Sequence, residues 1–265
     1  MEDKDKYAVV KAETGGAIAL PDYIKPATSG AMGELDRDDL VLPRLAVAQP
    51  TAPELVRGGT KYIPGLNQGD LFNTLTREKV EQPARVVVVR REPTRAIEFA
   101  PMEDGGGIVD RNVPTTKDAD GRYTDPRMRF TEDENGETVK PVATELREYV
   151  ALLLTPTGLE PIVLSFKGTS LGAAKALNSL LTLPLRGRKV EPWARVVAVV
   201  ANPTKNAKGA YFVFGVTQVG MADAATYRTA EETLKGFSGR KVADDQELES
   251  APAPGREPGS DDAEF

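Results

Sequence analysis

The stretch EYVALLLTPTGLEPIVLSFKGTSLGAAKALNSLL, residues 148–181, carries the clearest fold pattern in the chain. Residues 148–155 and 160–166 are apolar runs of strand length, and the Pro-Thr-Gly sequence between them is typical of a turn, so the pair predicts a β-hairpin. Thr169 or Ser170 then caps a predicted helix that runs to about residue 181 with its leucines on one face. The stretch therefore predicts strand, turn, strand and helix in that order.

Further strand patterns lie on both sides of this stretch. Residues 84–91 contain four successive valines, which suit a strand buried on both faces, and a second short strand is expected at 95–99. Downstream, the valine-rich run 194–201 and the alternating run 210–219 predict two strands joined by a polar turn at 202–209. A last helix is expected at about 224–237.

This order of elements predicts a mixed β protein with few helices, of the α+β class. An OB fold is a five-stranded barrel with a helix between its third and fourth strands, and when residues 84–91 are counted as the first strand the helix at about 170–181 falls near that place. Other small α+β barrels and sandwiches fit the same order. The order of elements therefore favours an OB-like barrel but also fits these other folds.

The chain divides into three parts by composition. Residues 1–40 are predicted to form a largely flexible N-terminal arm, and residues 41–243 the folded core. Within the core, residues 101–142 are charged and rich in glycine and proline, which predicts an exposed, mobile polar insertion. Residues 244–265 lack apolar periodicity, so we expect a disordered acidic C-terminal tail.

Charge is distributed unevenly along the chain, whose formal net charge is −6. The tail holds eight acids against one arginine, a net of −7, and residues 1–40 hold nine acids against five bases, a net of −4. Subtracting both from −6 leaves +5 for residues 41–243. The core is therefore mildly basic, which makes nucleic acid a plausible partner.

Cysteine and histidine are both absent. Their absence excludes disulfides, thiolate metal sites and every nucleophile that depends on histidine. The sequence Lys167-Gly168-Thr169-Ser170 lacks the spacing of a P-loop, and Gly105-Gly106-Gly107 lacks the strand-to-helix setting of a dinucleotide site. We therefore expect no enzyme, no cofactor and no metal, although a magnesium-dependent nuclease built from carboxylates stays open.

Basic and aromatic residues flank the predicted core strands. Cations that follow a phosphate backbone and aromatic rings that stack on unpaired bases are what single-strand binding requires. The candidate nucleic-acid-binding residues are Arg85, Arg90, Arg91, Arg95, Lys167, Lys175, Arg188, Lys189, Trp193, Arg195, Lys205, Lys208, Tyr211 and Phe212. Each also has an ordinary interpretation, because an arginine beside a strand is often a solvated end and an aromatic residue is often core.

The resemblance of the chain is to phage-type single-stranded DNA-binding proteins. It rests on residues 42–45 (LPRL), Pro64-Gly65 with residues 69–73 (GDLFN), the segment from Phe166 to Leu181, residues 209–212 (GAYF) and the ending 261–265 (DDAEF). The resemblance implies an OB-like core that coats single-stranded DNA during replication, recombination or repair. The chain departs from it in its few aromatic residues and its long insertion.

The tail ends in an aromatic carboxyl terminus surrounded by acids. The resemblance implies that Asp261, Asp262, Glu264 and Phe265 recruit a replication partner such as a polymerase or helicase. A purely solubilising tail is the alternative. The sequence leaves homo-oligomerisation possible.

The expected function is single-stranded DNA binding. The alternative is a virion structural or assembly protein with no nucleic-acid role. The charged N-terminus is unlike a signal peptide, and no apolar run reaches the roughly 18–20 residues of a membrane span, so we expect a cytoplasmic location, that of the host cell if the protein is phage-encoded.

Overall fold

The computed structural model describes residues 41–100, 107–207 and 209–236. Its strands are β1 (Arg44–Val47), β2 (Leu71–Asn73), β3 (Lys79–Val80), β4 (Ala84–Arg91), β5 (Arg95–Phe99), β6 (Ile108–Val113), β7 (Thr131–Glu132), β8 (Thr138–Val139), β9 (Ala143–Thr155), β10 (Gly158–Lys167), β11 (Arg195–Asn206) and β12 (Gly209–Met221). Its helices are α1 (Leu171–Thr182) and α2 (Ala224–Gly236), with short 3-10 turns η1 (Pro53–Leu55), η3 (Pro126–Met128), η4 (Gly168–Ser170) and η5 (Pro192–Ala194). The described part is thus a mostly β, mixed α+β protein, as predicted.

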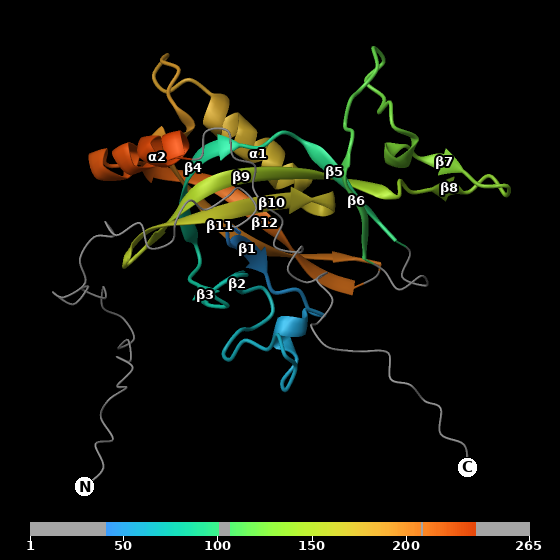
Figure 1. Ribbon diagram of the computed structural model, residues 1–265, viewed down its shortest axis with the longest axis horizontal. Coiled ribbons are helices and arrows are strands. Elements are labelled where there is room, and N and C mark those ends of the chain that lie inside the picture. The colour runs from blue at the N-terminus through green and yellow to red at the C-terminus, as the bar shows by residue number, and fades with distance from the viewer. Residues whose placement is uncertain (1–40, 101–106, 208, 237–265) are drawn as a thin grey trace, which may run out of the picture.

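One main sheet organises these elements. Its hydrogen-bonded order is β12-β11-β4-β9-β10-β1-β2-β3, with β5 pairing with β9 and β6, while β7 and β8 form a separate ribbon. The long strands twist and curl, so the sheet wraps into a half-barrel (Figure 1). This shape agrees with the barrel-like prediction.

The two faces of the sheet carry different cores. Alternate residues of β9 point to opposite faces, and Tyr149 and Leu153 belong to a cluster that includes Leu177 of α1. Leu152 belongs to a second cluster with Trp193 and Ala230 of α2. Helix α1 therefore closes the concave inner side of the sheet, and α2 covers part of its outer face.

The hairpin of β9 and β10 confirms the central prediction. Thr155 pairs with Gly158 next to the turn, and the pairing continues along both strands to Leu146 and Lys167. The predicted helix cap needs correction: Ser170 occupies the N-cap position of α1, but its side chain makes no capping hydrogen bond. The preceding turn η4 leads the chain into the helix instead.

The predicted polar turn at 202–209 also needs correction. Strand β11 continues to Asn206 and β12 begins at Gly209, and the two pair throughout this stretch, including Thr204 with Tyr211. Polar residues suit this end of the hairpin because it extends away from the core (Figure 1). Polarity alone therefore does not end a strand that has a paired neighbour.

The insertion was predicted to be polar and exposed, and its described part also contains secondary structure. Most of its described residues are exposed, yet they include β6, β7, β8 and η3. Val113 and Met128 are buried against Ala96 and Ala143 at the base of the insertion. Val113 and Met128 thus attach to the sheet a segment that looks wholly polar in sequence.

Strands β10 and β12 are not hydrogen-bonded neighbours, and residues near β1 help to bridge the distance between them. Strand β1 runs parallel to β10. The side chain of Gln49 reaches β12, where its Nε2 donates to the carbonyl of Phe212 at 2.9 Å and its Oε1 accepts from the amide of Phe212 at 3.0 Å. This pair of bonds occupies part of the edge of β12 and brings the two ends of the sheet together.

Candidate nucleic-acid interface

Four cationic side chains, which we call the basic rim, lie on neighbouring elements: Arg91 at the end of β4, Arg147 in β9, Lys167 at the end of β10 and Lys175 in α1. Lys167 follows Phe166, the partner of Arg147, and so points to the other face of the sheet. Arg91 pairs with Tyr149 across β4 and β9, and Arg147 pairs with Phe166 across β9 and β10. The hydroxyl of Tyr149 donates to Oδ1 of Asn178 in α1 at 2.9 Å. Lys175 lies one turn earlier in α1, three residues before Asn178, and so on the same side of the helix.

The basic rim keeps an excess of positive charge. Arg91, Lys167 and Lys175 are exposed, whereas Arg147 donates through Nε to Oε1 of Glu145 at 2.6 Å. The Nζ of Lys167 lies 5.3 Å from the centroid of the Phe99 ring, within the range of a cation–π contact. Burial raises the pKa of Tyr149, while the positive charges of Arg91 and Arg147 nearby oppose that rise. The surface is suited to an anionic ligand.

Arg147 was missed by the sequence analysis. The strand predicted from the sequence begins at Glu148, and Arg147 is not among the candidate cations. The sequence does contain a signal for a longer strand. Residues 144–148 continue the alternating pattern of the strand towards the insertion, and this places Arg147 within β9. The polar character of that extension concealed it.

The outer face of β9 holds a buried ion cluster around Glu148, which is 3% exposed. One carboxylate oxygen accepts from Arg44 of β1, and Ser165 of β10 donates to the same oxygen at 3.2 Å. The other oxygen accepts from Nη2 of Arg95 in β5 at 2.9 Å and from its Nε at 3.2 Å. A single carboxylate thus ties four strands together.

Two of the predicted DNA contacts, Arg90 and Arg95, are engaged inside the protein. Arg95 binds Glu148, and its Nη1 donates to the carbonyl of Arg111 at 3.1 Å. Arg90 pairs with Glu92 at 2.6 Å. A guanidinium whose donors already bind protein acceptors has few left for phosphate, so these two residues are structural in this conformation.

Two further candidates, Trp193 and Arg195, have side chains that lie in the core. Trp193 is 7% exposed and packs against Tyr227 of α2, with ring centroids 6.1 Å apart. Arg195 is 1% exposed and donates to the carbonyl of Leu183 at the C-terminal end of α1. The partial negative charge of a helix C-terminus stabilises a cation there. Neither side chain can stack on a base or reach a phosphate in this structure.

The remaining predicted residues are distributed over several elements. Arg85 is exposed on β4, Arg188 and Lys189 are exposed in the loop after α1, and Lys205 is exposed near the tip of the β11–β12 hairpin. Tyr211 and Phe212 are half-buried on β12. Lys208 and the tail residues Asp261, Asp262, Glu264 and Phe265 lie outside the described residues.

A polar contact network holds the base of the insertion beside β5 and β6. Arg127 binds carboxylate oxygens of Glu98 at 3.0 Å, Asp110 at 2.9 Å and Asp125 at 2.8 Å. The hydrogen bond from Arg127 is the main cause that lowers the pKa of Asp125. For Asp110 the backbone amide of Asn112 is the main cause of a lowered pKa, with Arg127 second. The network fixes the direction in which the insertion leaves the sheet.

The ionisation of Tyr123 reports on the packing at the base of the insertion. Burial, followed by a hydrogen bond from its hydroxyl to Glu145, raises the pKa of Tyr123 to about 12. The folded protein therefore disfavours the phenolate, and the stability this contributes is present below about pH 10, the unfolded value, and is lost as the pH rises towards about 12.

We expect the ultraviolet titration of the wild-type protein to contain one tyrosine with a pKa of about 12 that is absent from Tyr123→Phe. Glu145→Gln should bring that titration closer to the ordinary value, because it removes the negative charge next to the phenolate. Circular dichroism at each pH would show that the protein is still folded. A Tyr123 that titrates at about 10 in the folded protein would contradict the contact.

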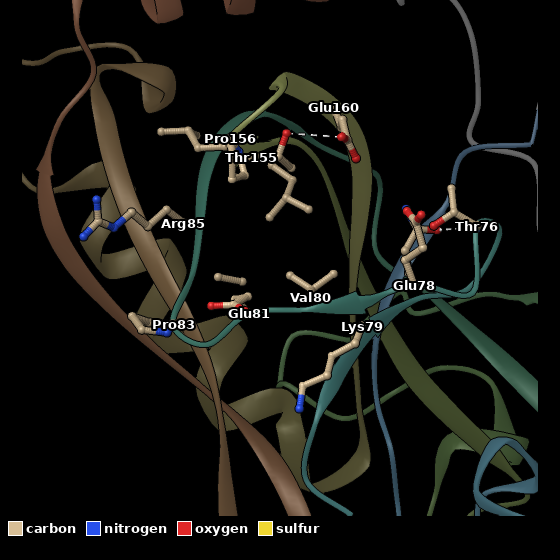
Figure 2. A pocket seen from close by; sticks show the side chains of 14 residues that line it. Thr76, Glu78, Lys79, Val80, Glu81, Pro83, Arg85, Thr155, Pro156 and Glu160 are labelled. Carbon is tan, nitrogen blue, oxygen red and sulfur yellow. Dashed lines mark hydrogen bonds between the residues drawn. The ribbon is translucent and has the colours of Figure 1, made fainter. Parts of the chain in front are cut away.

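A cavity of about 300 Å³ lies between β3, the start of β4 and the turn of the β9–β10 hairpin. Glu78, Glu81 and Glu160 are among its lining residues. Figure 2 shows the side chain of Arg85 directed away from the others, and Lys79 instead forms an ion pair of 2.8 Å with Asp70. The cavity thus presents carboxylates rather than cations, and it is poorly suited to bind a phosphate.

Within 41–100, 107–207 and 209–236, no group of three or more acidic side chains is arranged to hold a metal ion. None of the helices in the described part is both long and apolar enough to cross a membrane.

The fold and this surface define the class of the molecule: a mostly β, barrel-like α+β protein with a basic rim at one end of its sheet. The model of the Pam3 phage gp34-like protein family matches residues 12–243, and the chain belongs to that family. No curated protein and no solved structure matches the chain. The family agrees with the expected bacteriophage origin, and single-stranded DNA binding stays a prediction.

Proposed function

We propose that the protein binds single-stranded DNA through an OB-like barrel, without a catalytic role. The observation that carries the proposal is strand connectivity. Taken in chain order, β4, β9, β10, β11 and β12 are five long strands, and α1 lies between the third and the fourth. Their spatial order is β12-β11-β4-β9-β10, which is the order in which an OB barrel pairs its five strands.

Side chains supply the closure that such a barrel requires between its third and fifth strands. The rings of Phe166 in β10 and Phe214 in β12 meet edge to face with centroids 5.5 Å apart. Phe166 also meets Tyr149 of β9 at 5.6 Å. A row of three aromatic rings thus spans the interior from β9 to β12, supporting a partly open barrel rather than a flat sheet.

The position of the basic rim supports the proposal, because its residues belong to the elements that an OB fold uses to bind its ligand. Oligonucleotides lie on the face of the second and third strands, between the loop that joins strands one and two and the loop that joins strands four and five. Here β9 and β10 carry Arg147 and Lys167, the first loop is the insertion, and the second is the hairpin tip with Lys205. Tyr211 and Phe99 are half-buried aromatics at the two sides, available for base stacking.

Binding of the full chain to fluorescein-labelled 40-nucleotide poly-dT, followed by anisotropy, tests the proposal. We expect poly-dT to bind more tightly than duplex of the same length and to bind less tightly as salt increases. Replacing Arg91, Lys167 and Lys175 with alanine should weaken binding roughly tenfold and reduce the salt slope by about 0.7 for each lost phosphate contact.

The matched control replaces three exposed cations elsewhere, Arg57, Arg228 and Lys235, with alanine. It changes the net charge by the same amount, so it separates a local contact from a general charge effect. No salt-sensitive binding to poly-dT would end the proposal and leave the virion assembly alternative. An equal loss in the control would show that the basic rim is not the binding surface.

The acidic tail supports a second element of the proposal. Asp261, Asp262, Glu264 and Phe265 combine negative charge with an aromatic carboxyl terminus, a combination that suits a basic, apolar pocket on a replication protein. We propose a replication, recombination or repair role on this ground.

A further inference from the structure

The tip of the insertion presents an unusual surface, which we call the acidic hairpin: residues 130–139, including β7 and β8. Phe130 is 68% exposed and Val139 is 42% exposed. Glu132, Glu134 and Glu137 are exposed beside them. Thr131, the residue after Phe130, pairs with Val139, so the two apolar side chains are close together. Contiguous exposed apolar surface that is bordered by polar residues is a mark of interaction sites. The negative charge repels phosphate, so the fitting partner is a protein with a basic surface.

The acidic hairpin is held out from the sheet rather than folded back on it. Its base is fixed by the ion pairs of Arg127 and by the burial of Met128, which is 6% exposed. Beyond this base, β7 and β8 pair with each other through two residue pairs only. A two-stranded ribbon of this kind gains stability by packing against another surface.

A complementary surface exists elsewhere on the same chain, in the loop that follows α1; we call it the basic loop, residues 183–189. Leu183 is 60% exposed, and Arg186, Arg188 and Lys189 are exposed around it. The loop has a defined shape, because the amides and carbonyls of Leu185 and Arg188 bond to each other in both directions at 2.9 Å. It offers an apolar contact bordered by cations.

The two surfaces lie far apart in Figure 1, the acidic hairpin beside the β7 and β8 labels and the basic loop at the top of the view beyond α1, towards α2. They cannot meet within one chain, and their charges and apolar residues match. We propose that the acidic hairpin of one copy docks on the basic loop of a second copy. The contact joins two different surfaces, so it is head-to-tail and produces rings or open chains of subunits rather than closed dimers.

This self-association does not depend on the proposed DNA binding. The residues involved are separate from the basic rim, so either proposal can fail without the other. If both hold, successive subunits would lie side by side along one strand. The occupant is a second copy because the matching basic and apolar surface is present on the chain itself.

Charge-reversal substitutions in the full chain test the proposal. Self-association is measured by sedimentation velocity at several protein and salt concentrations. The wild-type protein should form larger oligomers as the protein concentration rises, and these oligomers should dissociate as the salt concentration rises. Glu132→Lys with Glu134→Lys, and separately Arg186→Glu with Arg188→Glu, should each weaken association roughly tenfold through like-charge repulsion. Mixing the two variants should restore a complex, because the reversed hairpin then meets the reversed loop.

Cross-linking provides a second measurement, which the absence of native cysteine makes unambiguous. The variant with Glu134→Cys and Lys189→Cys should form a ladder of oligomers on mild oxidation, and each single variant should stop at dimers. Unchanged far-ultraviolet circular dichroism shows that the substitutions, all at exposed positions, leave the fold intact. A wild-type protein that stays monomeric at every concentration, or mixed variants that fail to associate, overturns the proposal.

Discussion

Replacing Glu148 with alanine is expected to lower the free energy of unfolding by about 3–5 kcal/mol, the cost of removing one partner from a buried ion pair. Glu148 is 3% exposed and accepts from Arg44, Arg95 and Ser165. Without the carboxylate, two largely buried guanidinium groups lose their counter-charge. The loss is large because the arginines come from strands on both sides of β9 and cannot both turn to water without separating those strands.

Urea unfolding followed by circular dichroism measures this loss. Glu134→Ala serves as the control, since Glu134 is exposed, and should change the free energy of unfolding by less than about 0.5 kcal/mol. A triple variant, Arg44→Met, Arg95→Met and Glu148→Leu, removes every charge of the cluster and should lose much less than Glu148→Ala. A loss below about 1 kcal/mol for Glu148→Ala would show that the cluster is solvated rather than buried.

The sequence predicted the strands that are apolar on both faces and missed the contacts that organise their edges. Residues 84–91 and the hairpin at 148–166 are recognisable because burial on two faces leaves a continuous apolar run. Glu148 looked like a strand end, because its partners Arg44 and Arg95 are 104 and 53 residues away in the chain. No local pattern reports a contact across such distances.

The candidate site shows the same limit. Residue type identified cations near strand ends, and three of them, Arg91, Lys167 and Lys175, belong to the exposed basic rim. Residue type alone does not distinguish these cations from Arg95, which forms an ion pair with Glu148, or from Arg195, which donates to a carbonyl at the C-terminal end of α1. Whether a cation is free depends on what the fold places opposite it, and that information is tertiary.

Phe166→Ala is expected to lower the free energy of unfolding by about 3–5 kcal/mol, because apolar burial is lost and a cavity is left behind. This substitution tests barrel closure. The residue is fully buried and lies between Tyr149 and Phe214. Phe130→Ala is the matched control: the same substitution at a side chain 68% exposed should change the free energy of unfolding by less than about 0.5 kcal/mol.

A double-mutant cycle of Phe166 and Phe214 then separates closure from simple burial. Strands β10 and β12 share no backbone ladder, so any coupling between them passes through side chains. If the rings meet across a closed barrel, the two alanine substitutions should be non-additive by about 0.5–1.5 kcal/mol. Strict additivity would mean that β12 packs independently of β10. The half-barrel would then be open in solution, and the connectivity argument for an OB-like barrel would lose its physical basis.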